Sequence, residues 1–209
     1  MNKPTISDLQ DSGRYQLIES FSIDDMKDFL LRELGINSSP KPARLTLKTL
    51  PFTLLMGGLG AATGFLLAKS AITMPFWQLA GGLVGLILLL PIHEAIHALV
   101  FKAFGAPNVG FGYSLKSLIV YAYAQRFVLS MKEVALVAAM PFLVITTALV
   151  IAWVVWPSLG LLWGSTLVFH TLACVGDYVL VRYAYKNRHR AVFTYDDLTE
   201  RMSYFYERT

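Results

Sequence analysis

The sequence predicts an all-α polytopic membrane protein with four transmembrane helices, a short cytoplasmic β-hairpin and amphipathic terminal helices. Three observations support this fold class. Of the 209 residues, 55% are hydrophobic and only 15% are charged. Four apolar stretches are long enough to cross a hydrocarbon core of about 30 Å. The net charge is +4, and all 18 basic residues lie outside these stretches, so we expect a lipid bilayer as a partner and no nucleic acid.

Residues 1–48 are predicted to form a cytoplasmic segment that contains one amphipathic helix. Ser22 followed by Asp25 matches a helix N-cap, and apolar residues then recur at helical spacing as far as Gly35. The segment lacks the basic start and apolar run of a cleavable signal, so targeting is expected to depend on an internal span. The only cysteine, Cys174, cannot form an intramolecular disulfide.

The four predicted spans form one membrane domain over residues 49–181. They cover residues 49–68, 74–101, 134–156 and 159–181, with a cytoplasmic loop at 102–133. If both termini are cytoplasmic, 17 of the 18 basic residues lie inside, as the positive-inside rule requires. We therefore expect a multi-pass protein of the inner or plasma membrane.

Two polar segments carry further structure. Within residues 109–124, Gly110 and Gly112 alternate with apolar and aromatic residues before a turn at 114–117, and residues 118–124 after it are rich in β-forming residues, which predicts a hairpin at the membrane surface. In the cytoplasmic tail, residues 182–209, Thr194 and Asp197 repeat the N-cap pattern ahead of apolar residues at helical spacing. The tail is therefore predicted to contain a second amphipathic helix.

The chemistry of the chain is concentrated near the end of the second span. His93, Glu94 and His97 form an HExxH motif. Residues i and i+4 share one helix face, so both imidazoles can bind one metal ion while the intervening carboxylate reaches a water on that ion. A carboxylate buried in a span is costly, at least about 2.5 kcal/mol on insertion scales, which favours a functional use for Glu94.

Asp177 is the second carboxylate in the predicted spans. His97 lies five residues before Lys102, and Asp177 lies five residues before Arg182. Because both spans run toward the cytosol, the two side chains are expected at the same depth, about 7 Å from the cytoplasmic boundary. Asp177 is the favoured third metal ligand. There are two alternatives: His170 could be the third ligand, or Asp177 could support the site without binding the metal ion.

Two histidines and one carboxylate leave one position open in a tetrahedral zinc site, which is typical of catalytic zinc. Zinc would lower the pKa of a bound water toward about 7, and Glu94 would act as general base and then protonate the leaving amine. These residues predict hydrolysis of a peptide bond.

His170 and Cys174 lie close to Asp177 in the sequence. His170 precedes Asp177 by seven residues and so shares its helix face, where it could act in catalysis on a substrate carbonyl or serve as a buried structural histidine. Cys174 is either a zinc ligand or, as is usual for a lone cysteine in an apolar helix, a small core residue.

A family resemblance rests on the HExxH motif and on three further features. These are a glycine-containing loop (Gly105, Gly110, Gly112), Pro141–Phe142 in the next span and Gly176–Asp177 in the last. Over residues 75–182 the chain resembles the putative zincin peptidases, small bacterial membrane proteins similar to the site-2 class of intramembrane zinc metalloproteases.

The resemblance implies zinc bound by His93, His97 and Asp177, with Glu94 as the catalytic acid/base. His170 stands where the site-2 class often has asparagine. The resemblance also implies substrates that are membrane-spanning or membrane-attached peptide segments, cleaved near the cytosolic face. The sequence does not identify the substrate or the oligomeric state.

Two other functions fit parts of the sequence. A transporter, sensor or assembly factor could use the three ligands as a cation site without hydrolysis, and would not need a general base. A serine intramembrane protease using Ser165 and His170 is disfavoured, because Gly164–Ser165 lacks the following glycine expected of rhomboids.

Overall fold

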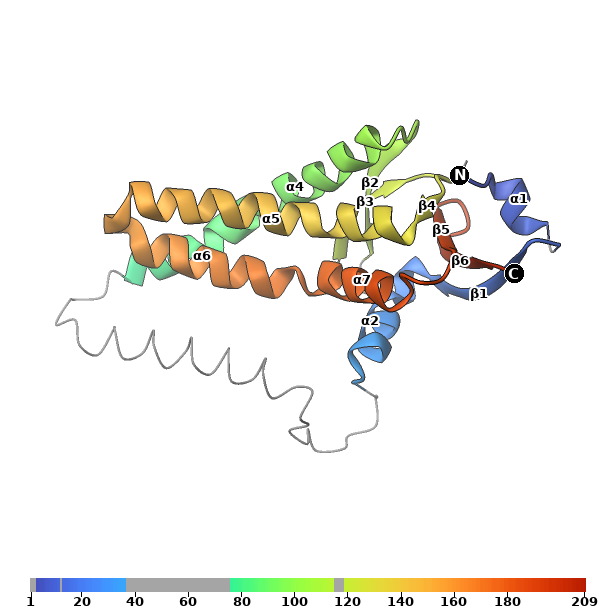
Figure 1. Cartoon of the computed structure of the whole chain (residues 1–209). Helices are drawn as coiled ribbons and strands as arrows, with labels where there is room; N and C mark the ends of the chain where they lie inside the picture. The colour runs from blue at the N-terminus through green and yellow to red at the C-terminus, as the bar shows by residue number, and fades with distance from the viewer. Residues whose placement is uncertain (1–2, 12, 37–75, 115–118) are drawn as a thin grey trace.

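The computed structural model describes residues 3–11, 13–36, 76–114 and 119–209. Figure 1 shows an elongated molecule in which long helices form one half and strands form the other. Within the described residues the chain has six α-helices, a four-stranded sheet and a two-stranded sheet. The predicted all-α fold class is therefore wrong, and the fold is mixed α/β.

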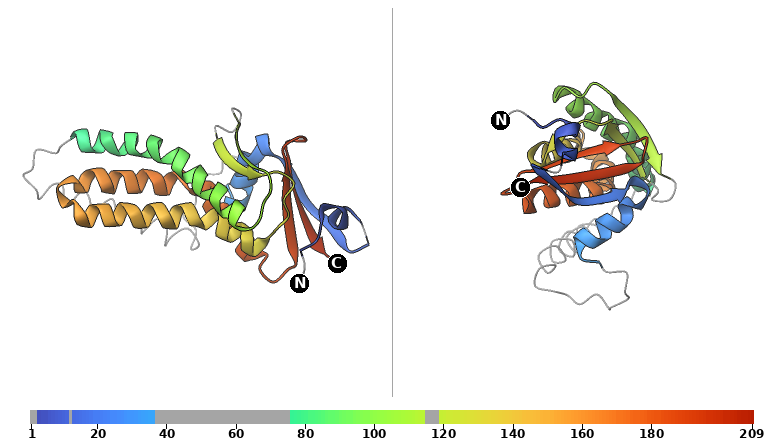
Figure 2. Two further views of the ribbon diagram at one scale, coloured as in Figure 1. Left: turned by 90° about the horizontal axis from the view of Figure 1, so that it is seen from above. Right: turned by 90° about the vertical axis from the view of Figure 1, so that its right-hand side faces the viewer.

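The helical half consists of three helical segments that pack side by side, with the first running obliquely to the other two (Figure 2). The first is α4 (Phe76–Ala103), the second is α5 (Met131–Val155), and the third comprises α6 (Gly160–Ala173) followed by α7 (Val175–Lys186). α4, α5 and α6 are mainly apolar, whereas α7 carries charged residues. In lipid, the backbone groups of such apolar segments are satisfied only by helical hydrogen bonds.

The number of spans also differs from the prediction. Among the described residues, α4 and α5 are long and apolar enough to cross a membrane, which indicates membrane association. The predicted span 159–181 is instead a pair of helices bent by 51°, so the count rises to three only if this pair is one span. The predicted span 49–68 lies outside the described residues.

The four-stranded sheet lies across one end of the helices. Its strands are β1 (Tyr15–Ser22), β4 (Leu129–Ser130), β5 (Val192–Asp197) and β6 (Met202–Arg208). Their order is β1-β6-β5-β4, and all pairs are antiparallel. The sheet therefore joins the two ends of the chain and the start of α5.

The amphipathic helix predicted in the tail is wrong, because residues 192–208 form the β5–β6 hairpin. Thr194, expected to cap a helix, is instead paired with Phe205 in the sheet. Asp197 accepts a hydrogen bond from the backbone N–H of Thr199 at 2.9 Å, so it stabilises the hairpin turn. Short polar side chains serve both turns and helix caps, which explains the error.

The predicted N-terminal helix is present as α2 (Met26–Leu34), after α1 (Ile6–Gln10) and β1. It ends at Gly35, whose φ of 75° is accessible to glycine. Phe29 from α2 is 2% exposed and packs against Phe21, Tyr183 and Phe205. This aromatic core fastens the sheet to α7, the helix that carries Asp177.

The two-stranded sheet lies where the hairpin was predicted, as β2 (Val109–Ser114) and β3 (Ile119–Ala124). Gly110 is paired with Tyr123, and Gly112 with Tyr121. A Cβ added to either glycine would lie within 2.8 Å of the opposite tyrosine side chain. The glycines therefore make room for the tyrosines, and β3 itself packs against α4.

Candidate metal centre

The HExxH motif lies in the second half of α4, on the buried side of the helix. His93, Glu94 and His97 are 9%, 9% and 8% exposed. The Nε2 atoms of the two histidines are 3.2 Å apart, as expected for residues one helical turn apart. The motif thus presents two imidazole nitrogens to one point inside the protein.

The tautomer of His97 follows from its contact with α5. Its Nδ1 lies 2.9 Å from the backbone carbonyl oxygen of Val137. A carbonyl can only accept, so Nδ1 carries the proton and Nε2 presents a lone pair. This is the arrangement by which metal-binding histidines are held in proteins.

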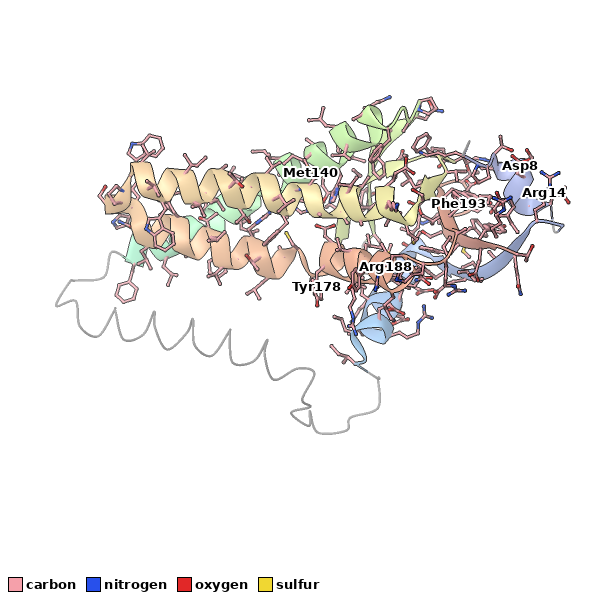
Figure 3. All side chains as sticks on the ribbon, in the orientation of Figure 1. Asp8, Arg14, Met140, Tyr178, Arg188 and Phe193 are labelled. Carbon is pink, nitrogen blue, oxygen red and sulfur yellow. The ribbon has the colours of Figure 1, made fainter. Side chains whose placement is uncertain are left out.

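Asp177 reaches the same point from the first turn of α7. Its Oδ2 lies 3.0 Å from Nε2 of His93, and its Oδ1 lies 3.3 Å from Nε2 of His97. The break between α6 and α7 redirects the chain immediately before this residue. The next residue, Tyr178, is 61% exposed and points outward in Figure 3. Asp177 instead faces the two histidines in the protein interior.

These three residues fit a zinc ion. Zinc bonds of about 2.0–2.1 Å in a tetrahedral site place the donor atoms about 3.3 Å apart. The observed separations between the two Nε2 atoms and the Asp177 oxygens are 3.0–3.3 Å. Two imidazoles and one carboxylate are also the donor types that zinc takes in catalytic sites.

Glu94 stands beside this donor set. A carboxylate oxygen of Glu94 and one nitrogen from each of His93 and His97 lie within 4.8 Å of one another. Its Oε2 accepts a hydrogen bond of 2.6 Å from the backbone N–H of Ala122 in β3. The carboxylate is therefore held between the donor atoms and the edge of the hairpin.

His170 lies on a different side of His93 from Asp177. Its Nε2 is 3.4 Å from Nδ1 of His93, and its ring stacks on Phe142. His170 thus contacts the nitrogen of His93 that Asp177 does not, and its catalytic role stays a prediction. Ser165 donates to the backbone carbonyl of Leu162 at 3.1 Å, which leaves no serine–histidine pair with His170.

Sequence reasoning missed the backbone groups that fix the site. The N–H of Ala122 and the carbonyl of Val137 orient Glu94 and His97. Backbone groups are present at every residue, so no side-chain pattern could have marked these two.

A comparison with protein families points to the same class of protein as this candidate zinc site. The model of a family described as "putative zincin peptidase" matches residues 86–192, just over half of the chain. The chain therefore belongs to this family of metallopeptidases, and membership implies zinc as the cofactor. Searches of curated proteins and of solved structures gave no significant match.

The matched range contains the HExxH motif, His170, Cys174 and Asp177. The N-terminal strand β1 and the final strand β6 lie outside it. The similarity to the site-2 class stays an expectation from the sequence.

Proposed function

We propose that the protein is a membrane-embedded zinc endopeptidase that cleaves membrane-spanning or membrane-associated peptide segments near the cytosolic face. The single observation that carries this proposal is the meeting of two imidazole nitrogens and a carboxylate at separations of 3.0–3.3 Å, with Glu94 beside them. A site that only stored or moved a cation would not need the adjacent carboxylate.

His93, His97 and Asp177 would hold the ion, which would act there as a Lewis acid toward the scissile carbonyl and the attacking water. Glu94 accepts the proton of that water and later delivers it to the leaving amine. The hydrogen bond from Ala122 fixes the direction in which its carboxylate points. His97 is kept in the required tautomer by Val137.

The edge of β3 supports a binding mode for the substrate. Ala122 is paired with Phe111, but its N–H is used by Glu94 and not by β2. In an antiparallel pair, alternate residues direct their N–H and C=O groups away from the partner strand. An extended substrate segment can therefore add to this edge in β-strand conformation, with its scissile bond next to Glu94. A substrate helix would first have to unwind.

The placement in a membrane rests on exposed apolar surface and on charge. Large apolar side chains are exposed along the long helices, among them Leu83, Ile87 and Leu88 on α4 and Leu143, Val150 and Val154 on α5. Basic residues flank the sheet-bearing ends of the helices, including Lys102, Lys132 and Arg182. We place the sheet half and both termini in the cytosol, in a multi-pass topology.

The test separates the peptidase from a metal-binding protein without hydrolytic activity. Membranes from cells that express the wild type are compared with membranes from cells that express Glu94→Gln, by labelling and sequencing newly exposed peptide N-termini. We expect a set of cleavage products that appears only with the wild type. Zinc in the purified proteins is measured in parallel, and Glu94→Gln should retain it.

Asp177→Ala is the matched variant for the ligand role. It should lose cleavage and the zinc ion of this site, whereas Glu94→Gln should lose cleavage alone. If Glu94→Gln produced the same cleavage products as the wild type, the proposed peptidase would be wrong. Unchanged zinc content in Asp177→Ala would remove this residue from the ligand set.

A further inference from the structure

A second group of side chains that could ligate a metal ion lies beside Nδ1 of His93, the ring nitrogen that faces away from Asp177. It consists of Nδ1 of His93, Nε2 of His170 and the Sγ atom of Cys174. The nitrogens are 3.4 Å apart, and the sulfur lies 3.5 Å from His170 and 4.0 Å from His93. His93 and His170 come from α4 and α6, and Cys174 stands at the break between α6 and α7.

These separations suit a tetrahedral ion. Zinc–nitrogen bonds of about 2.0–2.1 Å and a zinc–sulfur bond of about 2.3 Å place two nitrogens about 3.3 Å apart, and nitrogen and sulfur about 3.6 Å apart. Two of the three contacts are within about 0.1 Å of these values, and the third is about 0.4 Å longer.

Among the residues that the structure describes, the polar contacts of the His170 and Cys174 side chains are those within this group. His170 and Cys174 are 2% and 5% exposed, and the contacts of the thiol are with the two histidines. Phe142 covers the face of the His170 ring. A buried thiol beside two imidazole nitrogens is a soft donor set, of the kind that selects zinc or copper(I).

We propose that His93, His170 and Cys174 form a second metal site, which binds a thiophilic cation, Zn²⁺ or Cu⁺, next to the catalytic site and shares His93 with it. This site goes beyond the proposed peptidase activity, because neither Glu94 nor Asp177 belongs to it. His93 would bind one ion through Nε2 and the other through Nδ1. An ion here would tie α4 to the break between α6 and α7, three residues before Asp177.

The protons balance as follows. The thiol of Cys174 loses its proton to become a thiolate, and Nδ1 of His93 loses its proton when both nitrogens of the ring are metal-bound. When the catalytic site is already occupied, binding of the second ion therefore releases these two protons to solvent. The alternative is a single ion, with Nδ1 of His93 keeping its proton and donating it to His170.

Cobalt(II) separates these arrangements without a substrate. Full-length protein without a polyhistidine tag is purified in detergent, stripped of metal and titrated with Co²⁺. We expect two equivalents to bind, with a thiolate-to-cobalt charge-transfer band in the near ultraviolet. Cys174→Ser should abolish the band and bind one equivalent. Ala173→Ser, the same new side chain at the neighbouring exposed position, should keep both.

Asp177→Asn completes the set. The band should persist in this variant, because its source is the second site. If the band disappeared, Cys174 would belong to the catalytic site and the proposal would be wrong. One equivalent and no band in the wild type would also overturn it, and would assign His170 to the hydrogen-bonding role.

Parallel titrations with Zn²⁺, and with Cu⁺ under anaerobic conditions, identify the cation. A second equivalent of either ion that is lost in Cys174→Ser supports the site and names its occupant. Failure of both ions to bind a second equivalent contradicts it. Cleavage by the wild type is measured separately, so a failure of the second site is distinguishable from a failure of the proposed peptidase.

Discussion

Ala122 and Glu94 are joined by a hydrogen bond of 2.6 Å from the backbone N–H of one to the carboxylate of the other. The first residue belongs to an edge strand and the second to the HExxH helix, so this bond fixes the hairpin relative to the proposed general base. One contact thus positions both Ala122, in the strand proposed to pair with the substrate, and Glu94, which would activate water.

Replacing Ala122 with proline removes this donor. The N–H of Ala122 is not used by β2, and proline is tolerated on edge strands, so β2 and β3 should stay paired. Glu94 then loses its fixed direction. We expect kcat to fall about 10- to 100-fold, a part of the usual contribution of a general base. Cleavage of a reporter segment and zinc content are measured together.

Ala122→Gly is the control, because it alters the side chain but keeps the N–H. It should retain near wild-type turnover, and both variants should retain zinc. Equal activity in Ala122→Pro and Ala122→Gly would show that the bond to Glu94 is dispensable.

Zinc removal should lower the stability of the folded protein. The three proposed ligands come from α4 and α7, so a bound ion links two helices that are distant in sequence. A ligand that binds only the folded state stabilises it by about 4 kcal/mol at 1,000 times its dissociation constant. We expect a chelator to lower the melting temperature of the wild type in detergent, and to lower that of Asp177→Asn by less, because this variant lacks the ion of the catalytic site. A chelator shift of equal size in both proteins would argue against Asp177 as a ligand.

The residues of the candidate site could be predicted from the sequence more fully than the fold could. The i, i+4 spacing of His93 and His97 dictates a shared helix face, and matching distances from the basic boundary pointed to Asp177. The structure brings these three side chains together. The first argument uses local geometry along one helix, and the second compares depths in two helices; whether the three residues bind a metal ion stays a prediction.

The sheet was missed for a physical reason. Strands β1, β5 and β6 are short, and they pair the two ends of the chain, across more than 180 residues between Tyr15 and Arg208. No local pattern reports such a pairing. The break at Cys174 was also missed, because no proline marks that position. Its turn places Asp177 in the first helical turn after the break.

The pH dependence of stability should include a contribution from Asp196 in β5. Burial raises the pKa of this carboxyl above its usual value, although Ser203 donates a hydrogen bond to it at 2.6 Å. A carboxyl whose pKa is higher in the folded state than in the unfolded state stabilises the fold at low pH. This contribution is lost as pH rises from about 3.9, the unfolded value, through the raised folded value.

Asp196→Asn removes the ionisation and keeps an acceptor for Ser203. It should raise the melting temperature at pH 8, and the gain should shrink toward pH 4. Asp11→Asn makes the same change at an exposed position and serves as the matched control. A gain that is independent of pH in Asp196→Asn would contradict the assignment.

The packing of α4 against α6 depends more on Gly82 than on the neighbouring Gly81. A Cβ at Gly82 would lie 2.8 Å from Cβ of Ser165 and 3.0 Å from the backbone nitrogen of Thr166, atoms that cannot move without shifting α6. A Cβ at Gly81 would meet only the Cδ1 atom of Leu162, at 2.8 Å. The end of a leucine side chain can rotate away.

Gly82→Ala should therefore destabilise the protein by about 1–3 kcal/mol, the usual cost of overpacking, despite the better helix propensity of alanine. Gly81→Ala offers the same gain in propensity with little steric cost, so it should be neutral or slightly stabilising. Thermal unfolding in detergent measures both variants against the wild type. Because α6 leads into the break before Asp177, Gly82→Ala should also weaken zinc binding, and equal stability and zinc affinity in the two variants would refute this account of the contact.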